Sequence, residues 1–280
     1  MAFNPSEVIN LPIGLDYQGT RYREVHIAEM EGVDEENISD KKIRNNGARA
    51  MTVLLQRCVQ AIPGLVERKS DPYELIPAKY IRGMYTPDRD FIFLCVQALG
   101  MEETVETVVR CPRPTCGATQ DEVVELEDLE VYDWDEDAPP EIEVSLPVGF
   151  RDKDGKVFKD VTWRFPTGIQ QEKLAKVKRQ QVGTASIASC LQKIEGFGKP
   201  DTESVRRLKT RDRVYLMNQV REMTPGVDLR VETTCEECGH EFLGEVDLNS
   251  FFSGVGAENQ KTMPNGTNGR RKRRRTSSRS

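Results

Sequence analysis

Histidine is almost absent from this sequence, and long apolar runs are missing altogether. The 280 residues include two histidines, His26 and His240, and this scarcity argues against hydrolytic chemistry. No apolar stretch approaches the roughly 20 residues that a membrane-spanning helix requires. The opening MAFNPSEVINLP contains neither a basic nor an apolar segment, so it predicts no secretory signal. Phosphate-binding loops, dinucleotide fingerprints and nucleophile elbows are also missing, and we expect no enzyme.

The composition that remains is that of a folded protein with a well-solvated surface. Charged residues make up 31% and hydrophobic residues 37% of the chain, and the length allows one or two domains. Seven cysteines in a chain without an export signal indicate metal ligands or buried thiols rather than disulfides. We therefore expect a reducing cytoplasm.

Positive charge is concentrated at the C-terminus. The last eleven residues, RRKRRRTSSRS, carry seven positive charges and no acid, and without them the net charge of −6 becomes −13. The preceding residues are rich in Asn, Gly, Thr and Pro and have no apolar period. Residues 256–280 are therefore predicted to form a disordered basic tail on an acidic folded body. The seven positive charges of the last eleven residues are Arg270, Arg271, Lys272, Arg273, Arg274, Arg275 and Arg279.

Two stretches of the body match each other in sequence. Residues Leu11–Glu36 and Leu146–Glu172 align once one residue is added near the first turn, sharing LP-x-G, a turn glycine and alternating apolar positions. Coincidence is the less favoured interpretation, because the matches stay in register over 26 positions. We predict a duplicated unit, with a first half at 1–138 and a second half at 139–255.

Each copy is predicted to be a β-hairpin followed by helices. In the second copy, alternating strands around Glu143–Leu146 and Val161–Phe165 flank a DKDG turn. A calcium loop is the alternative for DKDG, but its later ligands are missing. Thr167 and Gln170 form a capping box that opens a helix through about Lys178. Apolar periodicity predicts further helices over 51–62, 86–100, 187–194 and 205–220.

Three cysteines and one group of basic residues belong to these helices. Cys58, Cys95 and Cys190 are expected to be small buried hydrophobes rather than nucleophiles. A solvated face is the simpler interpretation of the basic residues, and a binding surface is the alternative. The basic residues are Arg206, Arg207, Lys209, Arg211 and Arg213.

The remaining four cysteines have the spacing of metal-binding knuckles. Cys111 and Cys116 lie in CPRPTCG, and Cys235 and Cys238 lie in CEECG, each between two strand-like segments. A strand, two cysteines around a tight turn, a glycine and a returning strand form a zinc knuckle, which supplies two of the four ligands of a tetrahedral zinc ion. Two knuckles facing each other would complete one Cys₄ zinc ribbon.

The 118 residues between Cys116 and Cys235 are explained if each half of the duplication ends in one knuckle. Two unrelated pairs of surface thiols are the less favoured alternative. A closed Cys₄ site has no open coordination position, so the zinc would be structural. His240 would be a neighbouring donor or a solvent-facing residue rather than a ligand. The expected fold is thus α+β, with two pseudo-repeats of hairpin, helices and knuckle.

The order of these motifs resembles a viral protein family. The chain contains LP-x-G-x-x-Y, M-x-G-x-D-E-E and C-x₄-C-G, then LP-x-G, TG-x-x-x-E, GVD-x-x-V-x-x-x-C-x-x-C-G and finally DLNSFF at 247–252. Over residues 9–253 it resembles the zinc-ribbon baseplate hub and tail-assembly proteins of tailed phages, the family of the T-even-type baseplate hub subunit. The wider spacing of the first cysteine pair and the arginine-rich tail depart from that pattern.

The resemblance implies a protein made in the host cytoplasm that is built into a phage tail baseplate or assists its assembly. It implies contacts with other tail and baseplate proteins, a structural zinc, no catalysis and no membrane. Phe251 and Phe252 are the candidate partner-binding residues. The alternative is a nucleic-acid-binding regulator that uses the basic tail, because seven positive charges can neutralise several phosphates. A metal-dependent enzyme ranks third.

Overall fold

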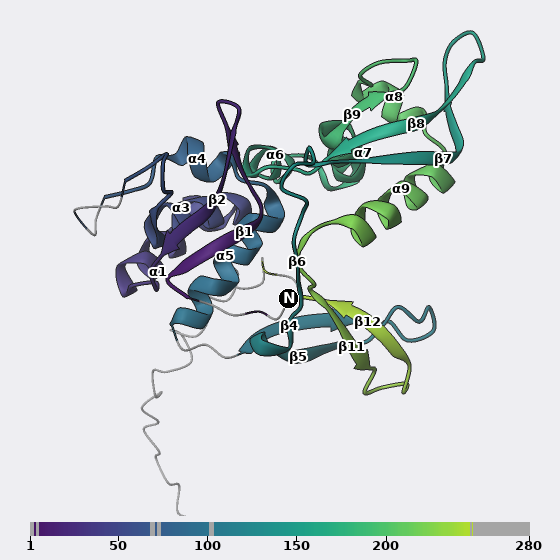
Figure 1. The fold of residues 1–280 in the computed structure, drawn as a ribbon. Coiled ribbons are helices and arrows are strands. Elements are labelled where there is room, and N and C mark those ends of the chain that lie inside the picture. Colours follow the sequence, from purple (N-terminus) through teal and green to yellow (C-terminus); the bar gives the residue numbers. More distant parts are fainter. Residues whose placement is uncertain are drawn as a thin grey trace, which may run out of the picture.

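The computed structural model describes residues 3, 6–67, 71, 74–100, 104–246 and 248. This part of the chain is a mixed α/β protein, built from several small antiparallel sheets and short helices (Figure 1). No helix among these residues is both long and apolar enough to cross a bilayer. Phe251, Phe252 and the basic tail, which the sequence marks as candidate interaction residues, lie outside the described residues.

The first half contains a three-stranded antiparallel sheet in the order β1, β2, β3. β1 (Val8–Tyr17) and β2 (Thr20–Ile27) form a hairpin, and β3 (Val59–Ala61) pairs with β2. The helices of this half are α1 (Gly32–Ser39), α2 (Lys41–Arg44), α3 (Gly47–Cys58), α4 (Ala78–Gly83) and α5 (Thr86–Leu99). α5 packs against β1, so the hairpin and the last helix share one core.

The second half contains a sheet of the same order, β7, β8, β9. β7 (Glu141–Arg151) and β8 (Val157–Arg164) form the hairpin that DKDG predicts, and β9 (Leu191–Ile194) pairs with β8. The helical elements of this half are α6 (Gly168–Leu174), η2 (Arg179–Gln181), α7 (Val182–Cys190), α8 (Thr202–Arg207) and α9 (Thr210–Met223). In both sheets the third strand begins immediately after a helix that ends in cysteine, Cys58 or Cys190.

Each hairpin is interrupted at its LP-x-G segment. The register of β1 against β2 shifts between Asn10 and Leu15, and that of β7 against β8 shifts between Ser145 and Phe150. Gly14 and Gly149 lie in these irregularities with φ of 101° and 93°, a conformation that favours glycine. A Cβ at Gly149 would also lie 2.7 Å from the carbonyl oxygen of Phe158. The glycine of each LP-x-G is therefore required by the backbone.

Two hydrophobic cores hold these parts together. The first surrounds β1–β3, α3 and α5, and it also includes Val124, Val246 and Leu248 from the segments around the cysteine hairpins. The second surrounds β7–β9 and α7–α9, and it takes in Ile13 and Tyr85 from the first half. A short sheet of β6 (Val131–Tyr132) and β10 (Gly226–Val227) adds another connection between distant segments. The two halves thus share side chains across their junction.

Several helix predictions were only partly right. The helix predicted over 187–194 ends at Cys190, because Leu191–Ile194 forms β9 on the open edge of β8. The helix predicted over 51–62 likewise begins at Gly47 and ends at Cys58, where β3 follows. Short apolar runs do not distinguish helix from buried strand, and the sheet edge decides between them.

The helix predicted over 205–220 is two helices, α8 and α9. The chain turns at Leu208, which is buried in the second core, and α9 begins again at Thr210. The capping box of Thr167 and Gln170 is present as predicted, but α6 ends at Leu174 rather than near Lys178. α5 has the predicted extent. Cys58, Cys95 and Cys190 are all buried, which confirms their expected environment.

Candidate metal centre

The first cysteine pair lies at the tip of an antiparallel hairpin. β4 (Thr104–Arg110) and β5 (Thr119–Glu125) pair without a break in register up to Arg110 and Thr119. The N–H of Cys111 then donates to the carbonyl of Ala118 at 2.8 Å, which extends the hairpin by one more pair. The chain turns tightly so that the N–H of Cys116 reaches the carbonyl of Arg113 at 2.9 Å. This turn brings the two sulfurs to the same side of the hairpin tip.

The second pair is built in the same way. β11 (Arg230–Thr234) and β12 (Glu241–Glu245) pair antiparallel, and the N–H of Cys235 donates to the carbonyl of His240 at 2.9 Å. The glycines that follow the second cysteine of each pair, Gly117 and Gly239, both have a φ of 65°. The two knuckles therefore share the backbone conformation of this glycine although their cysteine spacings differ.

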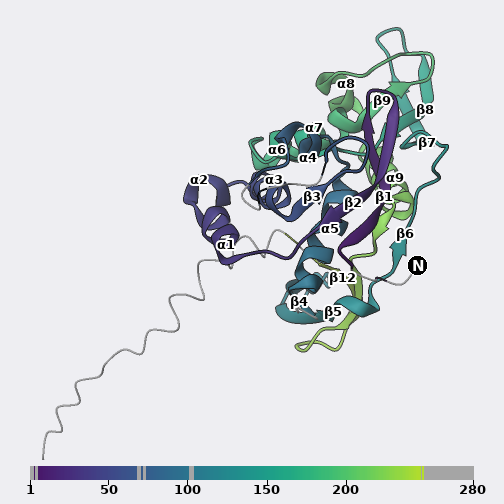
Figure 2. The same ribbon diagram turned by 60° about the vertical axis from the view of Figure 1, so that its left-hand side comes forward.

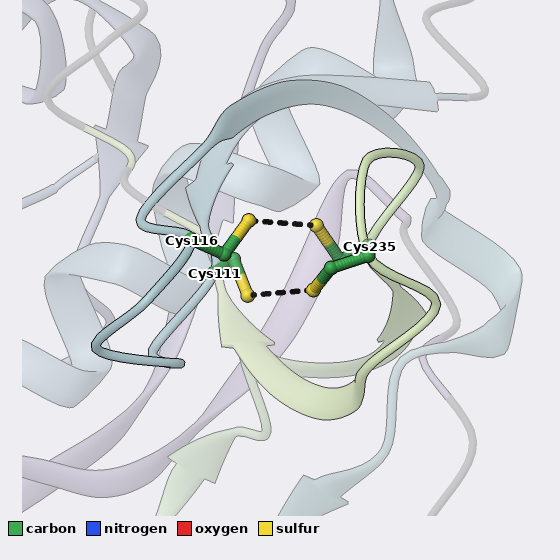
Figure 3. A group of neighbouring side chains, drawn as sticks. Cys111, Cys116 and Cys235 are labelled. Carbon is green, nitrogen blue, oxygen red and sulfur yellow. Dashed lines mark hydrogen bonds between the residues drawn. The ribbon is translucent and has the colours of Figure 1, made fainter.

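The two hairpin tips meet, and their four thiols form one cluster. The Sγ atoms of Cys111 and Cys238 lie 3.8 Å apart, those of Cys116 and Cys235 lie 3.7 Å apart, and all four lie within 4.8 Å of one another. Figure 3 shows the sulfurs of one hairpin facing those of the other. A zinc–sulfur distance of about 2.3 Å in a tetrahedron places neighbouring sulfurs about 3.8 Å apart. The cluster therefore has the size that a tetrahedral metal ion requires.

Backbone N–H groups surround these sulfurs as a thiolate site requires. The N–H groups of Arg113, Ala118 and His240 donate to the sulfurs of Cys111, Cys116 and Cys238 respectively. The donation from His240 lowers the pKa of Cys238 to about 7, whereas, against the N–H of Ala118, burial and the neighbouring thiols raise the pKa of Cys116 to about 11, and burial also raises that of Cys111. Metal-bound cysteine is deprotonated, and N–H donors stabilise that form. Four converging sulfurs, three of which accept a backbone N–H, could hold a metal ion.

The close approach of the two hairpins depends on a glycine. A Cβ at Gly244 on β12 would lie 2.7 Å from Cγ1 of Val109 on β4, so no side chain fits there without movement. Val109 is itself buried. This contact between β12 and β4 limits how closely the two hairpins approach each other.

Gln120 ties the hairpins together, and sequence reasoning missed it. Its Nε2 donates to the carbonyl of Thr234 at 3.1 Å and to Oγ1 of Thr233 at 3.2 Å, while its Oε1 accepts from the N–H of Glu236 at 3.0 Å. Gln120 thus satisfies the backbone beside Cys235 from the opposite hairpin. No local sequence pattern marks such a contact, because its partners lie more than 100 positions away.

The two histidines have no place in the thiol cluster. The ring of His240 stacks on Phe242 with a centroid distance of 6.2 Å, and only its backbone contacts the site. His26 lies on β2, where Nε2 is 3.0 Å from Oε1 of Glu24. The structure thus brings together the four predicted cysteines and does not add either histidine.

Two aspartates that the sequence reading passed over support the LP-x-G turns. Asp88 on α5 accepts from the N–H groups of Ile13 and Gly14 at 2.8 and 3.0 Å. Asp212 on α9 accepts from those of Val148 and Gly149 at 2.8 and 3.1 Å. The signal was present in the sequence, because T-x-D-R occurs at 86–89 and again at 210–213.

Comparisons of this chain with protein-family models, with curated proteins and with solved structures found no match.

Proposed function

We propose that this chain is a structural or assembly protein of a phage tail baseplate, which acts through protein–protein contacts and is held together by one zinc ion. The observation that carries the proposal is that four thiols from two hairpins, 118 residues apart in the chain, come together in one cluster. With all four positions of the ion taken by protein sulfur, the metal would stabilise the fold and would not bind substrate. The phage assignment is supported by the resemblance in motif order.

A duplicated unit is part of the proposal. Its support is the recurrence of the same sheet order, of the LP-x-G irregularity with its glycine, and of the aspartate that accepts two N–H bonds from that irregularity. In this interpretation each copy contributes one hairpin of a Cys₄ zinc ribbon, and the ribbon joins the ends of the two copies. The binding free energy of the metal would be folding free energy, on the order of 10 kcal/mol in small zinc peptides.

The direct test is affinity for tail proteins. The full-length chain, purified with its zinc content measured, should bind at least one hub, wedge or tape-measure protein encoded in the same genome. An unrelated protein of equal net charge serves as the control partner. Failure to bind any of these proteins would contradict the proposed function, and absence of zinc at one ion per chain would separately contradict the metal site.

The alternative function is nucleic-acid binding through the tail. Seven positive charges at 270–279 would give salt-dependent binding without sequence preference. Deleting residues 270–280 separates the two candidates. A regulator should lose nucleic-acid binding and function together, whereas an assembly protein should keep its protein partners.

A further inference from the structure

Basic residues cluster on the helices of the second half. The cluster, which we name the basic flank, consists of Lys178, Arg179, Arg206, Arg207, Lys209, Arg211 and Arg213. All except Arg213, which is half-buried, are exposed. α7 connects the segments that carry these residues. It packs against both η2 and α8, and a Cβ at its Gly183 would lie 3.5 Å from a guanidinium nitrogen of Arg213 on α9.

Most of this charge is not neutralised within the chain. Arg206 and Arg207 both contact the single carboxylate of Glu203, at 3.3 and 4.0 Å. The other five side chains form no ion pair with any described residue, and nearby Asp212 is committed to backbone N–H groups of β7. A net positive surface therefore lies on a protein whose body carries a net negative charge.

The cysteine hairpins carry the opposite charge. Residues 104–128 and 230–245, which we name the ribbon, contain eleven acidic and three basic residues. On the outer face of β11–β12, Glu232 lies directly opposite Leu243, and Glu241 lies two residues before Leu243 on the same face. All three side chains are exposed and line one surface hollow.

Both charged surfaces also expose apolar side chains. Leu243, Val123 and Val108 on the ribbon are 62%, 59% and 57% exposed. On α9, Val214 is 55% exposed and lies one turn after Arg211, so the two share a helix face. Apolar side chains within a charged rim are typical of protein–protein interfaces, whereas nucleic-acid phosphates offer no apolar surface to cover them.

The two surfaces cannot meet within one molecule. Arg221, near the C-terminal end of α9, lies 3.5 Å from Glu245 of the ribbon. Arg211 precedes Arg221 by ten residues on a helix that rises about 1.5 Å per residue, so the basic N-terminal end of α9 is about 15 Å from that contact. In Figures 1 and 2 the ribbon and α8 lie at opposite ends of the molecule.

We propose that the basic flank binds the ribbon of a second copy of this chain. The N-terminal half of α9, with Arg211 and Val214, would lie on the face formed by Glu232, Glu241 and Leu243, so that charges pair around an apolar centre. The contact joins two different surfaces, so a bound pair of copies leaves one basic flank and one ribbon free. Such contacts close into a ring or continue as an open array. The inference does not depend on the proposed function.

Sedimentation velocity of the full-length, zinc-loaded chain tests the contact. At about 50 mM salt the average mass should rise with protein concentration, and at about 500 mM salt screening should weaken association at least tenfold. The variants R207E/R211E and E232R/E241R should each be monomeric alone. Mixed in equal amounts they should associate again, because each reversed surface then meets a surface of opposite charge.

The matched control is K41E/R49E, which makes the same change of charge at two exposed positions of the first half. It should associate as the unaltered chain does, and zinc content and thermal stability verify that all variants fold. A chain that is monomeric at every concentration would overturn the proposal. So would association that survives R207E/R211E and disappears when residues 270–280 are deleted, because the tail would then bind the ribbon. Loss of DNA binding in R207E/R211E, with self-association unchanged, would assign the basic flank to nucleic acid.

Discussion

Asp88 and Asp212 hold corresponding positions in the two halves, and each carboxylate accepts the N–H groups of the third and fourth residues of an LP-x-G segment. Both side chains are fully buried. Each lies in the first turn of its helix, where the helix dipole favours negative charge. The strand irregularity and the helix start are thus fixed by the same side chain in both halves.

Replacing either aspartate with asparagine should destabilise its own half. An amide offers one acceptor and turns an N–H₂ group toward the second backbone N–H, so one hydrogen bond to a charged group is lost. We expect Asp212→Asn to lower the free energy of unfolding by about 1.5–3 kcal/mol. Urea unfolding measures this change. Asp154→Asn, on the exposed hairpin turn, is the control and should change stability by less than about 0.5 kcal/mol. Equal effects of the two substitutions would contradict the role of Asp212.

Loss of one thiol should release the ribbon without unfolding the cores. If the cluster holds zinc as proposed, Cys235→Ser should lose the ion, because three sulfurs no longer complete the tetrahedron. Amide hydrogen exchange should then accelerate across β4, β5, β11 and β12 while α3 and α5 stay protected. Cys95→Ala removes a fully buried thiol outside the cluster and should retain zinc. Equal zinc content in the two variants would contradict the metal site.

Sequence reasoning located the thiol cluster because the pattern is local. Two cysteines, a glycine and flanking strands specify a knuckle whatever the rest of the fold, and the four residues meet as expected. Gln120 could not be found in this way, because its partners belong to the other hairpin. Packing of distant segments determines such residues.

The errors in secondary structure have a similar cause. Leu191 and Ile194 suit a helix face by spacing, yet both are buried as β9 because β8 offers an unpaired edge. The break between α8 and α9 was also invisible in the apolar period. It follows from the need to bury Leu208 and to direct Asp212 at β7. Tertiary contacts decided each case where local preference was weak.

Gly244 should be intolerant of a side chain. The Cβ of Gly244→Ala would meet Val109 at 2.7 Å and force the hairpins apart, at a cost of about 1–3 kcal/mol. Because the cysteines lie at the tips of the same hairpins, zinc should also be removed faster by a chelator. Gly32→Ala is the control, since nothing lies within 4 Å of a Cβ there. Equal rates of zinc loss would contradict the proposed coupling.

Asp90 should make stability depend on pH. This half-buried side chain on α5 lines a cavity of about 330 Å³ with Met51 and Gln171, and it forms no hydrogen bond or ion pair with any described residue. Burial raises its pKa from 3.8 to about 7, although Arg89 opposes the shift. The folded chain therefore binds the proton more tightly than the unfolded chain does. The resulting stabilisation is complete below about pH 4 and is lost as the pH rises through 7.

Asp90→Asn should remove the part of this dependence that Asp90 causes, whereas Asp88, whose pKa burial also raises to about 7, contributes equally in both chains. The neutral amide has no charged form to bury, so the variant should be more stable than the unaltered chain at pH 8 by about 1–3 kcal/mol, and the difference should shrink toward zero near pH 4. Urea unfolding at a series of pH values measures the two curves. Asp154→Asn, which makes the same chemical change at an exposed position, again provides the control. A constant difference between Asp90→Asn and the unaltered chain across this range would show that the carboxyl titrates alike in the folded and unfolded states.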